Sequence, residues 1–405
     1  MKMDGKALDG VNVLSFCWRL AGPMTNTILA AYGATVVKVE TATRLDTQRD
    51  VSPFIGGEKS HDRATGFLFI NSGKLGITLN LKHPKGMSVA RRLIKWADVV
   101  IENFAGGAME RMGLGYEVLK GIKPDIIMLS SCLYGQTGPM ATVPGYAEPL
   151  TAATGIPYLT GFPDQLPQFP GFGFTDPVAI RANALAVASA LDYRERTGKG
   201  QYIDAAQLET TVPFLAPLLL DYQANNREAK RLGNRSDYAA PHGVYRCRGE
   251  DRWVAITVFS DQEWRDFCRA IGSPEWTRDP ALDTASGRLE NVDRLDDLVE
   301  GWTQGHTARE VTELLQGAGV AAGMASHAGD LDNDPQLKHR HFYWELEHPK
   351  IGAFSFSGMP VHMSKTPYEI KFAPGLGEHN EYVYTRLIGM SDEEFHQLLA
   401  EGTFE

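Results

Sequence analysis

The stretch VNVLSFCWRLAGPMTNTILAAYGATVVKVE, residues 11–40, carries the pattern that decides the fold. The apolar run VNVLSF predicts a buried strand, the helical stretch NTILAAYGA follows a loop, and TVVKVE predicts a second strand that ends at Glu40. A strand, a helix and a strand in this order are typical of a βαβ unit, whose two strands run parallel. The opening of the chain therefore predicts an α/β protein.

Further units of the same kind follow along the chain. Strands are predicted at 76–81, 98–104, 125–131 and 200–209, with helices at 86–97 and 116–122 and a longer helix after Asp176. Strands that alternate with helices form parallel sheets covered on both faces. We expect a Rossmann-like large domain over residues 1–224.

The character of the sequence changes at Asn225, where a polar segment begins. The stretch 242–259 alternates like a β-hairpin, and 263–272 and 308–320 read as short amphipathic helices. Residues 225–332 are therefore predicted to form a smaller α+β domain. Residues 333–405 are predicted to return to the large domain, with short strands in 354–364 and a helix over 391–402.

The composition narrows the class of protein. A chain of 405 residues with 43% hydrophobic residues has room for a large core and two or three domains. The net charge of −10 provides no general attraction to nucleic acid or to an anionic membrane, and no apolar run is long enough to span a bilayer. Four cysteines without paired spacing are expected to be reduced, buried thiols, so we predict a cytoplasmic protein with neither type of partner.

Several common site motifs are missing from the sequence. The first turn, CWRLAGPMTN, contains no GxGxxG, and the Walker, HExxH and GxSxG patterns are absent. The histidines at 339 and 341 are interpreted as part of a solvated turn rather than as ligands. The sequence therefore argues against a nicotinamide enzyme and predicts no metal site.

A single acid, Asp176, precedes the apolar helix in GFGFTDPVAIRANALAVASAL, residues 171–191. An Asp followed by Pro177 fits a helix cap, because the carboxylate accepts hydrogen bonds from free N–H groups and proline is tolerated at the first helical position. An accessible carboxylate can also act as a nucleophile. Local pattern alone favours the cap.

Six stretches together resemble one protein family. They are LAGPMTNTILAAYGATVVKVE (20–40), ITLNLKHPKG (77–86), ADVVIENFAGGAMERMGLGYEVL (97–119), YGQTGP (134–139), RTGKGQYIDAAQLE (196–209) and LGEH (376–379). In this order they resemble the family III CoA-transferases, which include formyl-CoA and carnitine CoA-transferases and α-methylacyl-CoA racemase. The resemblance spans nearly the whole chain, so it is specific for the family and much less so for the substrate.

The resemblance implies that Asp176 is the catalytic acid, because it stands just before the helix that leads into RTGKGQ. It also implies a covalent mechanism through an aspartyl anhydride and an aspartyl-CoA thioester. Coenzyme A and acyl-CoA would then be substrates, and no permanently bound cofactor is expected. The cap and the nucleophile are compatible roles, since a carboxylate at a helix N-terminus is electrostatically stabilised.

The resemblance also supplies a set of expected binding residues. We expect the CoA site to include Arg19, Leu20, Ala21, Leu79, Lys82, Asn103, Phe104, Arg111 and Cys132, and the acyl pocket to include Trp18, Tyr146, Phe172 and Phe174. Each residue alone has an ordinary alternative, as surface charge or as core. Thr41 stands where relatives often carry a basic residue near the nucleotide, and the nearest cation after it is Arg44.

Within the family, transfer is favoured over racemisation. The racemase uses a histidine and an aspartate in a segment where this chain has Tyr146 and Ala147, and tyrosine is a poor base at neutral pH because its reference pKa is about 10. Relatives form interlocked dimers, so we expect a homodimer or a heteromer with a related chain. We predict succinyl-CoA as donor and an arylsuccinate-type or other bulky acid as acceptor. A carnitine-type transferase, a racemase and one subunit of a heteromeric transferase are the alternatives.

Overall fold

The computed structural model describes residues 5–348 and 351–405, which separate into two compact units. Among the described residues, unit 1 comprises 5–154, 170–224, 338–348 and 351–405, and unit 2 comprises 155–169 and 225–337.

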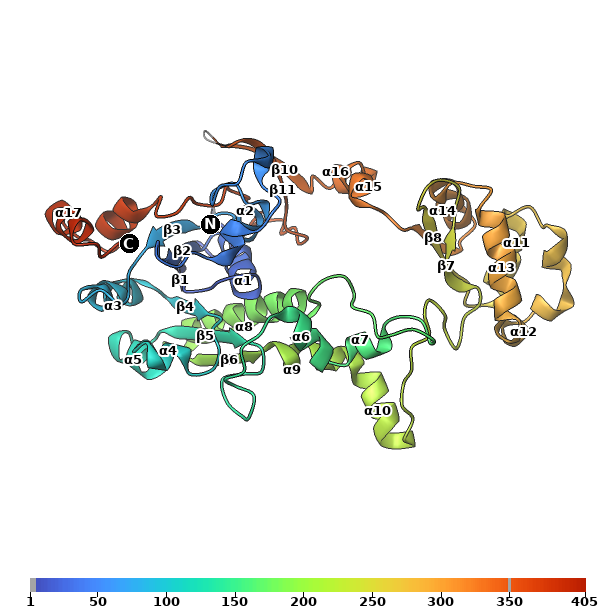
Figure 1. Ribbon diagram of the computed structural model, residues 1–405, viewed down its shortest axis with the longest axis horizontal. Helices are drawn as coiled ribbons and strands as arrows, with labels where there is room; N and C mark the ends of the chain where they lie inside the picture. The colour runs from blue at the N-terminus through green and yellow to red at the C-terminus, as the bar shows by residue number, and fades with distance from the viewer. Residues whose placement is uncertain (1–4, 349–350) are drawn as a thin grey trace. The chain divides into compact units, whose positions relative to one another are not determined.

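Unit 1 is built on a six-stranded sheet with the order β3-β2-β1-β4-β5-β6, and every neighbouring pair is parallel (Figure 1). Its strands are β1 (Asn12–Ser15), β2 (Thr35–Glu40), β3 (Leu75–Thr78), β4 (Val99–Glu102), β5 (Ile127–Cys132) and β6 (Tyr202–Ala206). The predicted α/β class and parallel sheet are confirmed. The strand order reverses direction between β1 and β4, which is where open α/β sheets bind their ligands.

Helices cover both faces of this sheet. On one face, α3 (Gly86–Trp96), α5 (Tyr116–Ile122) and α17 (Asp392–Ala400) enclose an apolar core that includes Leu14, Val37 and Ile77. On the other face, α1 (Ala21–Ala31) and α8 (Thr175–Thr197) pack on Val13, Val36 and Ile127. Alternate residues of one strand thus enter different cores, because successive side chains point to opposite faces.

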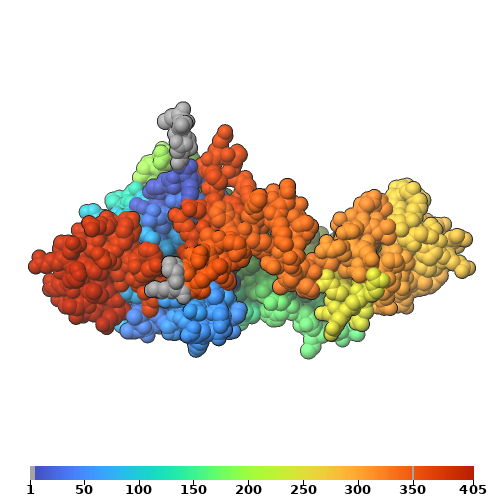
Figure 2. All heavy atoms as spheres, turned by 90° about the horizontal axis from the view of Figure 1, so that it is seen from above, coloured from blue at the N-terminus to red at the C-terminus, as the bar shows by residue number. Residues whose placement is uncertain are grey.

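The C-terminal segment belongs to unit 1. After the antiparallel hairpin of β10 (Tyr343–His348) and β11 (Gly352–Ser357), the chain reaches the sheet core through Tyr384 and Phe395. The red C-terminal residues form one continuous block beside the blue N-terminal part of the same unit (Figure 2). The strand predicted over 354–364 ends at Ser357, and only this first part is extended in a ladder.

Unit 2 holds a three-stranded antiparallel sheet, β7-β8-β9, made of His242–Arg246, Trp253–Thr257 and Ala321–Met324. Its main helices are α11 (Asp261–Ala270), α13 (Val292–Thr303) and α14 (Ala308–Gly317), which pack on a core that contains Trp264 and Phe267. The predicted hairpin and both predicted helices are present. Ser260 and Thr307 start α11 and α14 with complete capping boxes, so local sequence signals determine these helix starts.

Two local expectations were wrong. Helix α1 begins at Ala21 and includes the stretch expected to be a loop, since Pro23 lies in the first turn, where its missing N–H costs no hydrogen bond. Cys268 is only partly buried, whereas the other three cysteines are buried. All four are free thiols.

Candidate active site

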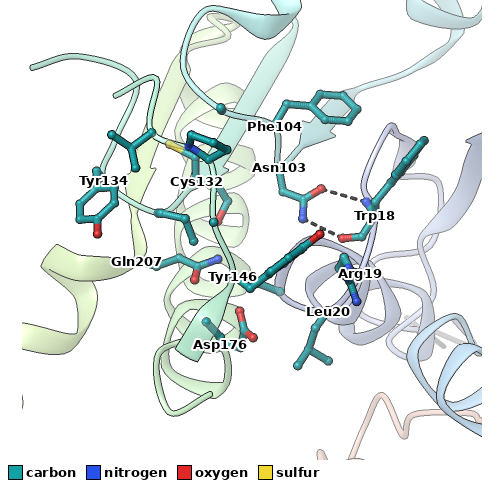
Figure 3. Close-up of a pocket in the computed structure, with 18 of the residues that line it drawn as sticks. Trp18, Arg19, Leu20, Asn103, Phe104, Cys132, Tyr134, Tyr146, Asp176 and Gln207 are labelled. Carbon is teal, nitrogen blue, oxygen red and sulfur yellow. Dashed lines mark hydrogen bonds between the residues drawn. The ribbon is translucent and has the colours of Figure 1, made fainter. Parts of the chain in front are cut away.

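A cavity of about 900 Å³ opens at the carboxyl ends of β1, β4 and β5, beside the reversal in strand order. Its walls come from the loops after these strands and from the starts of α1, α6 (Ala147–Ala153), α8 and α9 (Gln207–Thr211). The residues that bear on the chemistry are Trp18, Arg19, Leu20, Ala21, Arg44, Gln48, Asn103, Phe104, Cys132, Tyr146, Glu148, Asp176 and Gln207 (Figure 3). Sheet topology therefore brings together residues that are far apart in the sequence.

Asn103 joins the loops that follow β1 and β4. Its side-chain oxygen accepts a hydrogen bond from the Trp18 N–H at 2.9 Å, and its amide group donates to the Trp18 carbonyl at 2.8 Å. Both bonds are drawn in Figure 3. The Trp18 ring meets the Phe104 ring edge-on, with centroids 6.4 Å apart. These contacts fix one wall of the cavity at the point where the strand order reverses.

Arg19 is held in an unusual backbone conformation. Its φ of 69° lies in the left-handed region, which is costly for a residue with a side chain. Asp46, which is fully buried, accepts a hydrogen bond from the Arg19 N–H at 3.2 Å and forms an ion pair with Lys38 at 2.9 Å. The Arg19 guanidinium lies 4.2 Å from the centre of the Tyr146 ring. A buried ion pair thus stabilises the strained residue that presents this side chain to the cavity.

Asp176 lies in the first turn of α8, one residue after the helix begins at Thr175. It does not cap the helix, because the cap position is Phe174 and no side chain accepts a capping hydrogen bond there. The expectation of a cap was therefore wrong. Gly173 brings this turn close to α6, where any side chain in its place would collide with Ala147.

The surroundings of Asp176 disfavour its charged form. Burial, and then the negative charge of Glu148, raise the pKa of Asp176 from 3.8 to about 6. Within residues 5–348 and 351–405, no cation forms a salt bridge with this carboxylate. A carboxylate that is partly desolvated, unpaired and still ionised at neutral pH is suited to nucleophilic attack.

Cys132 also lines the cavity, but burial raises the pKa of its thiol to about 11. Cys17, which follows β1 and does not line the cavity, is fully buried, and burial raises its pKa to about 12. Both side chains therefore stay protonated at neutral pH, and a protonated thiol is a weak nucleophile. Asp176 is the stronger candidate for the reacting group.

Five expected site residues do not line the cavity. Leu79 is buried under the sheet edge, and Lys82 and Arg111 are exposed. Arg111 donates a hydrogen bond to the Gly106 carbonyl at 3.3 Å. Phe172 is 55% exposed, and Phe174 packs against Phe172 and Phe214.

Sequence reasoning gave no site role to several residues that do line the cavity, namely Arg44, Gln48, Glu148 and Gln207. Gln207 is the most informative, since it is 4% exposed and its side-chain oxygen has no hydrogen-bond partner. A buried amide oxygen without a partner is unfavourable unless a ligand donates a hydrogen bond to it. The signal in the sequence is a glutamine directly after the apolar end of β6.

No group of three His, Cys, Asp or Glu side chains in the described part of the chain is placed to hold a metal ion. In the same part of the chain, no helix is long and apolar enough to cross a membrane. What the cavity does contain is one desolvated carboxylate, two arginines and a set of amide side chains.

An open parallel sheet whose switch-point cavity carries a desolvated carboxylate is typical of an α/β enzyme. The sequence pattern of CoA-transferase family III matches residues 8–380, and the chain belongs to this family of enzymes. It is 31% identical to succinyl-CoA–D-citramalate CoA-transferase of Chloroflexus aurantiacus, with 98% of each chain covered. It is 30% identical to human succinyl-CoA:glutarate CoA-transferase, which covers 99% of this chain and 90% of that protein. The crystal structure of a CAIB/BAIF family protein from Brucella suis superimposes with a TM-score of 0.86 and 32% identity, over 95% of this chain and all of that one.

Proposed function

We propose that this enzyme transfers CoA from succinyl-CoA to a second dicarboxylic acid, with Asp176 as the nucleophile. The observation that carries the proposal is the carboxylate itself, which faces the switch-point cavity, lacks a cationic partner and has a pKa raised to about 6. At neutral pH most of it is ionised, and it is less well solvated than a surface acid. The names of the relatives supply the substrate class, because they pair succinyl-CoA with citramalate and with glutarate.

The reaction runs in two symmetrical halves. The Asp176 carboxylate attacks the thioester carbonyl of the donor, CoA thiolate leaves, and a mixed anhydride forms. The thiolate then attacks the aspartyl carbonyl of the anhydride, which releases the donor acid and leaves an aspartyl-CoA thioester. In the second half the acceptor carboxylate attacks this thioester, CoA thiolate leaves again, and a second anhydride forms. The CoA thiolate then attacks the acceptor carbonyl of this anhydride, which releases the acceptor as its CoA thioester. Asp176 is regenerated and no water is consumed.

Each step forms a tetrahedral oxyanion, so the cavity has to supply N–H donors and exclude water. Two features support this assignment. The side-chain amide of Gln207 lines the cavity, and helix α1 begins at Ala21 without a side-chain cap, so no side chain occupies its first N–H groups. We propose these groups as the oxyanion donors.

We retain seven of the nine residues expected at the CoA site as proposals and reassign Arg19 and Leu20 to the acyl group. Ala21, Asn103, Phe104 and Cys132 line the cavity and are assigned to the pantetheine arm. Leu79, Lys82 and Arg111 lie outside the cavity and are assigned to the nucleotide end of CoA. Trp18, Leu20 and Tyr146 would form the acyl pocket, with Phe172 and Phe174 as outer walls that hinder water. A bulky acceptor such as an arylsuccinate would use the apolar surface of Trp18 and Leu20.

The alternative reactions have less support. Racemisation needs a second acid or base opposite Asp176, and no histidine is among the residues that line the described cavity. Tyr146 occupies the relevant position, but its ring is stacked on Arg19. A carnitine-type acceptor carries a fixed positive charge, whereas both arginines of the cavity would repel it.

We further propose a dimer, either of two identical interlocked chains or with a related chain. Helix α10 (Ala216–Asn225) supports this, because none of its residues is buried and its apolar side chains include Leu220, which is 62% exposed. Apolar surface of this kind marks an interface. One relative, 32% identical, is the beta subunit of succinyl-CoA–L-malate CoA-transferase of Chloroflexus aurantiacus.

We also retain the domain limits 1–224, 225–332 and 333–405 as our proposal for the domain boundaries in the sequence.

The mechanism is tested by trapping the intermediate. The enzyme is incubated with succinyl-CoA and then with hydroxylamine, which converts an aspartyl thioester or anhydride into a stable hydroxamate, and the modified peptide is mapped by mass spectrometry. The adduct is expected on Asp176, and Asp176→Ala serves as the control that cannot form it. A succinyl group on Cys132 in a sample not treated with hydroxylamine, or full transfer activity in Asp176→Ala, would disprove the mechanism. Exchange of deuterium into the α-carbon without CoA transfer would support the racemase.

A further inference from the structure

Two arginines line the cavity, and neither forms a salt bridge within the described residues. The Arg19 guanidinium lies 4.2 Å from the centre of the Tyr146 ring, and the Arg44 guanidinium lies 5.0 Å from the centre of the Trp18 ring. Stacking on an aromatic ring holds a guanidinium group in one plane and leaves its N–H donors free at the edge. Both side chains are therefore set to receive an anion from solution.

Arg19 is the more firmly positioned of the two. Its N–H is bound by the buried carboxylate of Asp46, which Lys38 and the Gln48 N–H also contact. Its own side chain is partly buried, whereas Arg44 is exposed. A fixed, partly desolvated guanidinium binds a carboxylate more strongly than a mobile surface one, because less entropy is lost and the charge is less screened.

Arg19 also faces the reacting end of the cavity. Tyr146, on which it stacks, is the cap residue of α6, and Glu148 in the first turn of that helix is close enough to Asp176 to raise its pKa. Figure 3 shows the Tyr146 ring between the side of the cavity that holds Asp176 and the side that holds Trp18, with Arg19 beside the ring. The pantetheine arm separates the phosphates of CoA from its sulfur. A cation at the reacting end therefore meets the acyl group rather than the phosphates.

Charge balance requires such a cation if the substrate is a dicarboxylate. Apart from Arg19 and Arg44, the charged residues that line the cavity are Glu148 and Asp176, both acidic. A second carboxylate on the substrate would be repelled by these two groups unless an opposite charge is placed beside it.

We propose that Arg19 binds the distal carboxylate of a dicarboxylic acyl group while Asp176 reacts with the proximal one. This inference rests on the proposed function and adds to it the residue that sets substrate class. Donor and acceptor pass through the same anhydride position on Asp176, so one arginine serves both halves of the reaction. The enzyme then selects dicarboxylates twice, as the acyl group of the donor thioester and as the free acceptor acid.

The test compares substrates that differ only in the distal carboxylate. Initial rates of new thioester formation are measured for succinyl-CoA with glutarate and for butyryl-CoA with pentanoate, in the wild type and in Arg19→Met, Arg19→Lys and Arg44→Gln. Methionine keeps the unbranched inner part of the side chain and meets the same backbone strain as arginine, so loss of the guanidinium is the main change. Arg91→Gln, an exposed position on α3 outside the cavity, is the surface control.

Arg19→Met is expected to lower kcat/KM about 100-fold for the dicarboxylate pair and to leave the monocarboxylate pair within about threefold. Arg19→Lys is expected to fall between, because lysine keeps the charge but loses the fork geometry. An equal loss with both pairs would overturn the proposal, since it would place Arg19 on CoA. The proposal would also be overturned if Arg19→Met kept the preference for dicarboxylates, or if Arg44→Gln lost it. If the wild type transfers CoA with neither pair, or forms no adduct on Asp176, the proposed function itself fails.

Discussion

The cavity of unit 1 and the core of unit 2 differ in whether a buried charged side chain has a partner of opposite charge. In unit 2 the fully buried guanidinium of Arg288 forms an ion pair at 3.1 Å with Asp261, whose side chain is partly exposed, and donates to the Ala240 carbonyl at 2.7 Å, while its Nη2 has no hydrogen-bond partner. In the cavity of unit 1, Asp176 is desolvated without a cation, and the amide oxygen of Gln207 has no partner. Helices α11 and α14 start with capping boxes, whereas α1 and α8 start without side-chain caps.

This difference separates structural from functional residues. The buried charge in unit 2 is compensated by an opposite charge, whereas the cavity of unit 1 holds a carboxylate without a cation, and its strained arginine also forms no salt bridge within the described residues. Arg19 has a strained backbone, Asp176 is desolvated without a cation, and the side-chain oxygen of Gln207 has no partner. All three residues line one cavity. The comparison predicts that substitutions in the cavity lower activity more than stability, and that those in the core of unit 2 do the reverse.

The largest effect is expected from Asp176→Asn. Loss of the nucleophile should lower kcat/KM at least about 1000-fold. Because the folded pKa is raised to about 6, the ionised carboxylate destabilises the fold above that pH, and this penalty disappears below the ordinary value of 3.8. Asparagine should therefore increase the free energy of unfolding at pH 8 by on the order of 1 kcal/mol and leave it unchanged near pH 3. Thioester assays and denaturant unfolding at the two pH values measure these effects, and a less stable variant at pH 8 would contradict the comparison.

The next largest effect concerns Arg288→Ala in unit 2. Removal of this guanidinium leaves Asp261 without its ion-pair partner and two carbonyl groups without their donor, and it opens a cavity beside Trp264. The free energy of unfolding of unit 2 should fall by about 3 kcal/mol. Arg265→Ala, at an exposed position on α11, should change it by less than about 0.5 kcal/mol. Equal stability of the two variants in denaturant titrations would show that the Arg288 guanidinium does not stabilise this unit.

A smaller effect is expected from Gln207→Met, which keeps the length of the side chain and removes the amide. Activity should fall about tenfold, because one donor to the oxyanion is lost. Stability should stay the same or rise by up to about 1 kcal/mol, because a buried oxygen without a partner is removed. Single-turnover rates and thermal unfolding measure the two effects. Full activity would show that Gln207 is only a packing residue.

The smallest effect is a shift in pH dependence. The acid limb of kcat/KM should have a midpoint near pH 6, set by the pKa of Asp176, with activity lost as the pH falls through that value. Glu148→Gln removes the second cause of the raised pKa, so the midpoint should move down by less than about one pH unit. Glu117→Gln, at an exposed position on α5, is the control and should leave the profile unchanged. A shift to higher pH in Glu148→Gln would contradict the electrostatic explanation.

The amino-acid sequence by itself determined the order of strands and helices, the parallel sheet and the family. Alternation in TVVKVE and the helical period in GMSVARRLIKWA are local signals, and the structure places β2 and α3 on these stretches. The capping residues Ser260 and Thr307 are likewise local signals, and α11 and α14 start at them. Asp176 could be singled out because its spacing from RTGKGQ is a property of the chain alone.

Only the tertiary structure decided what surrounds that acid. Arg19 and Tyr146 are distant in the sequence and are brought together at the carboxyl ends of the parallel strands. The pKa of Asp176 depends on burial and on Glu148. The side-chain oxygen of Gln207 is unsatisfied because the fold buries it and places no hydrogen-bond donor beside it. Helix and strand follow from neighbours along the chain. Charge, desolvation and unsatisfied polar groups follow from neighbours in space, which the sequence does not specify one residue at a time.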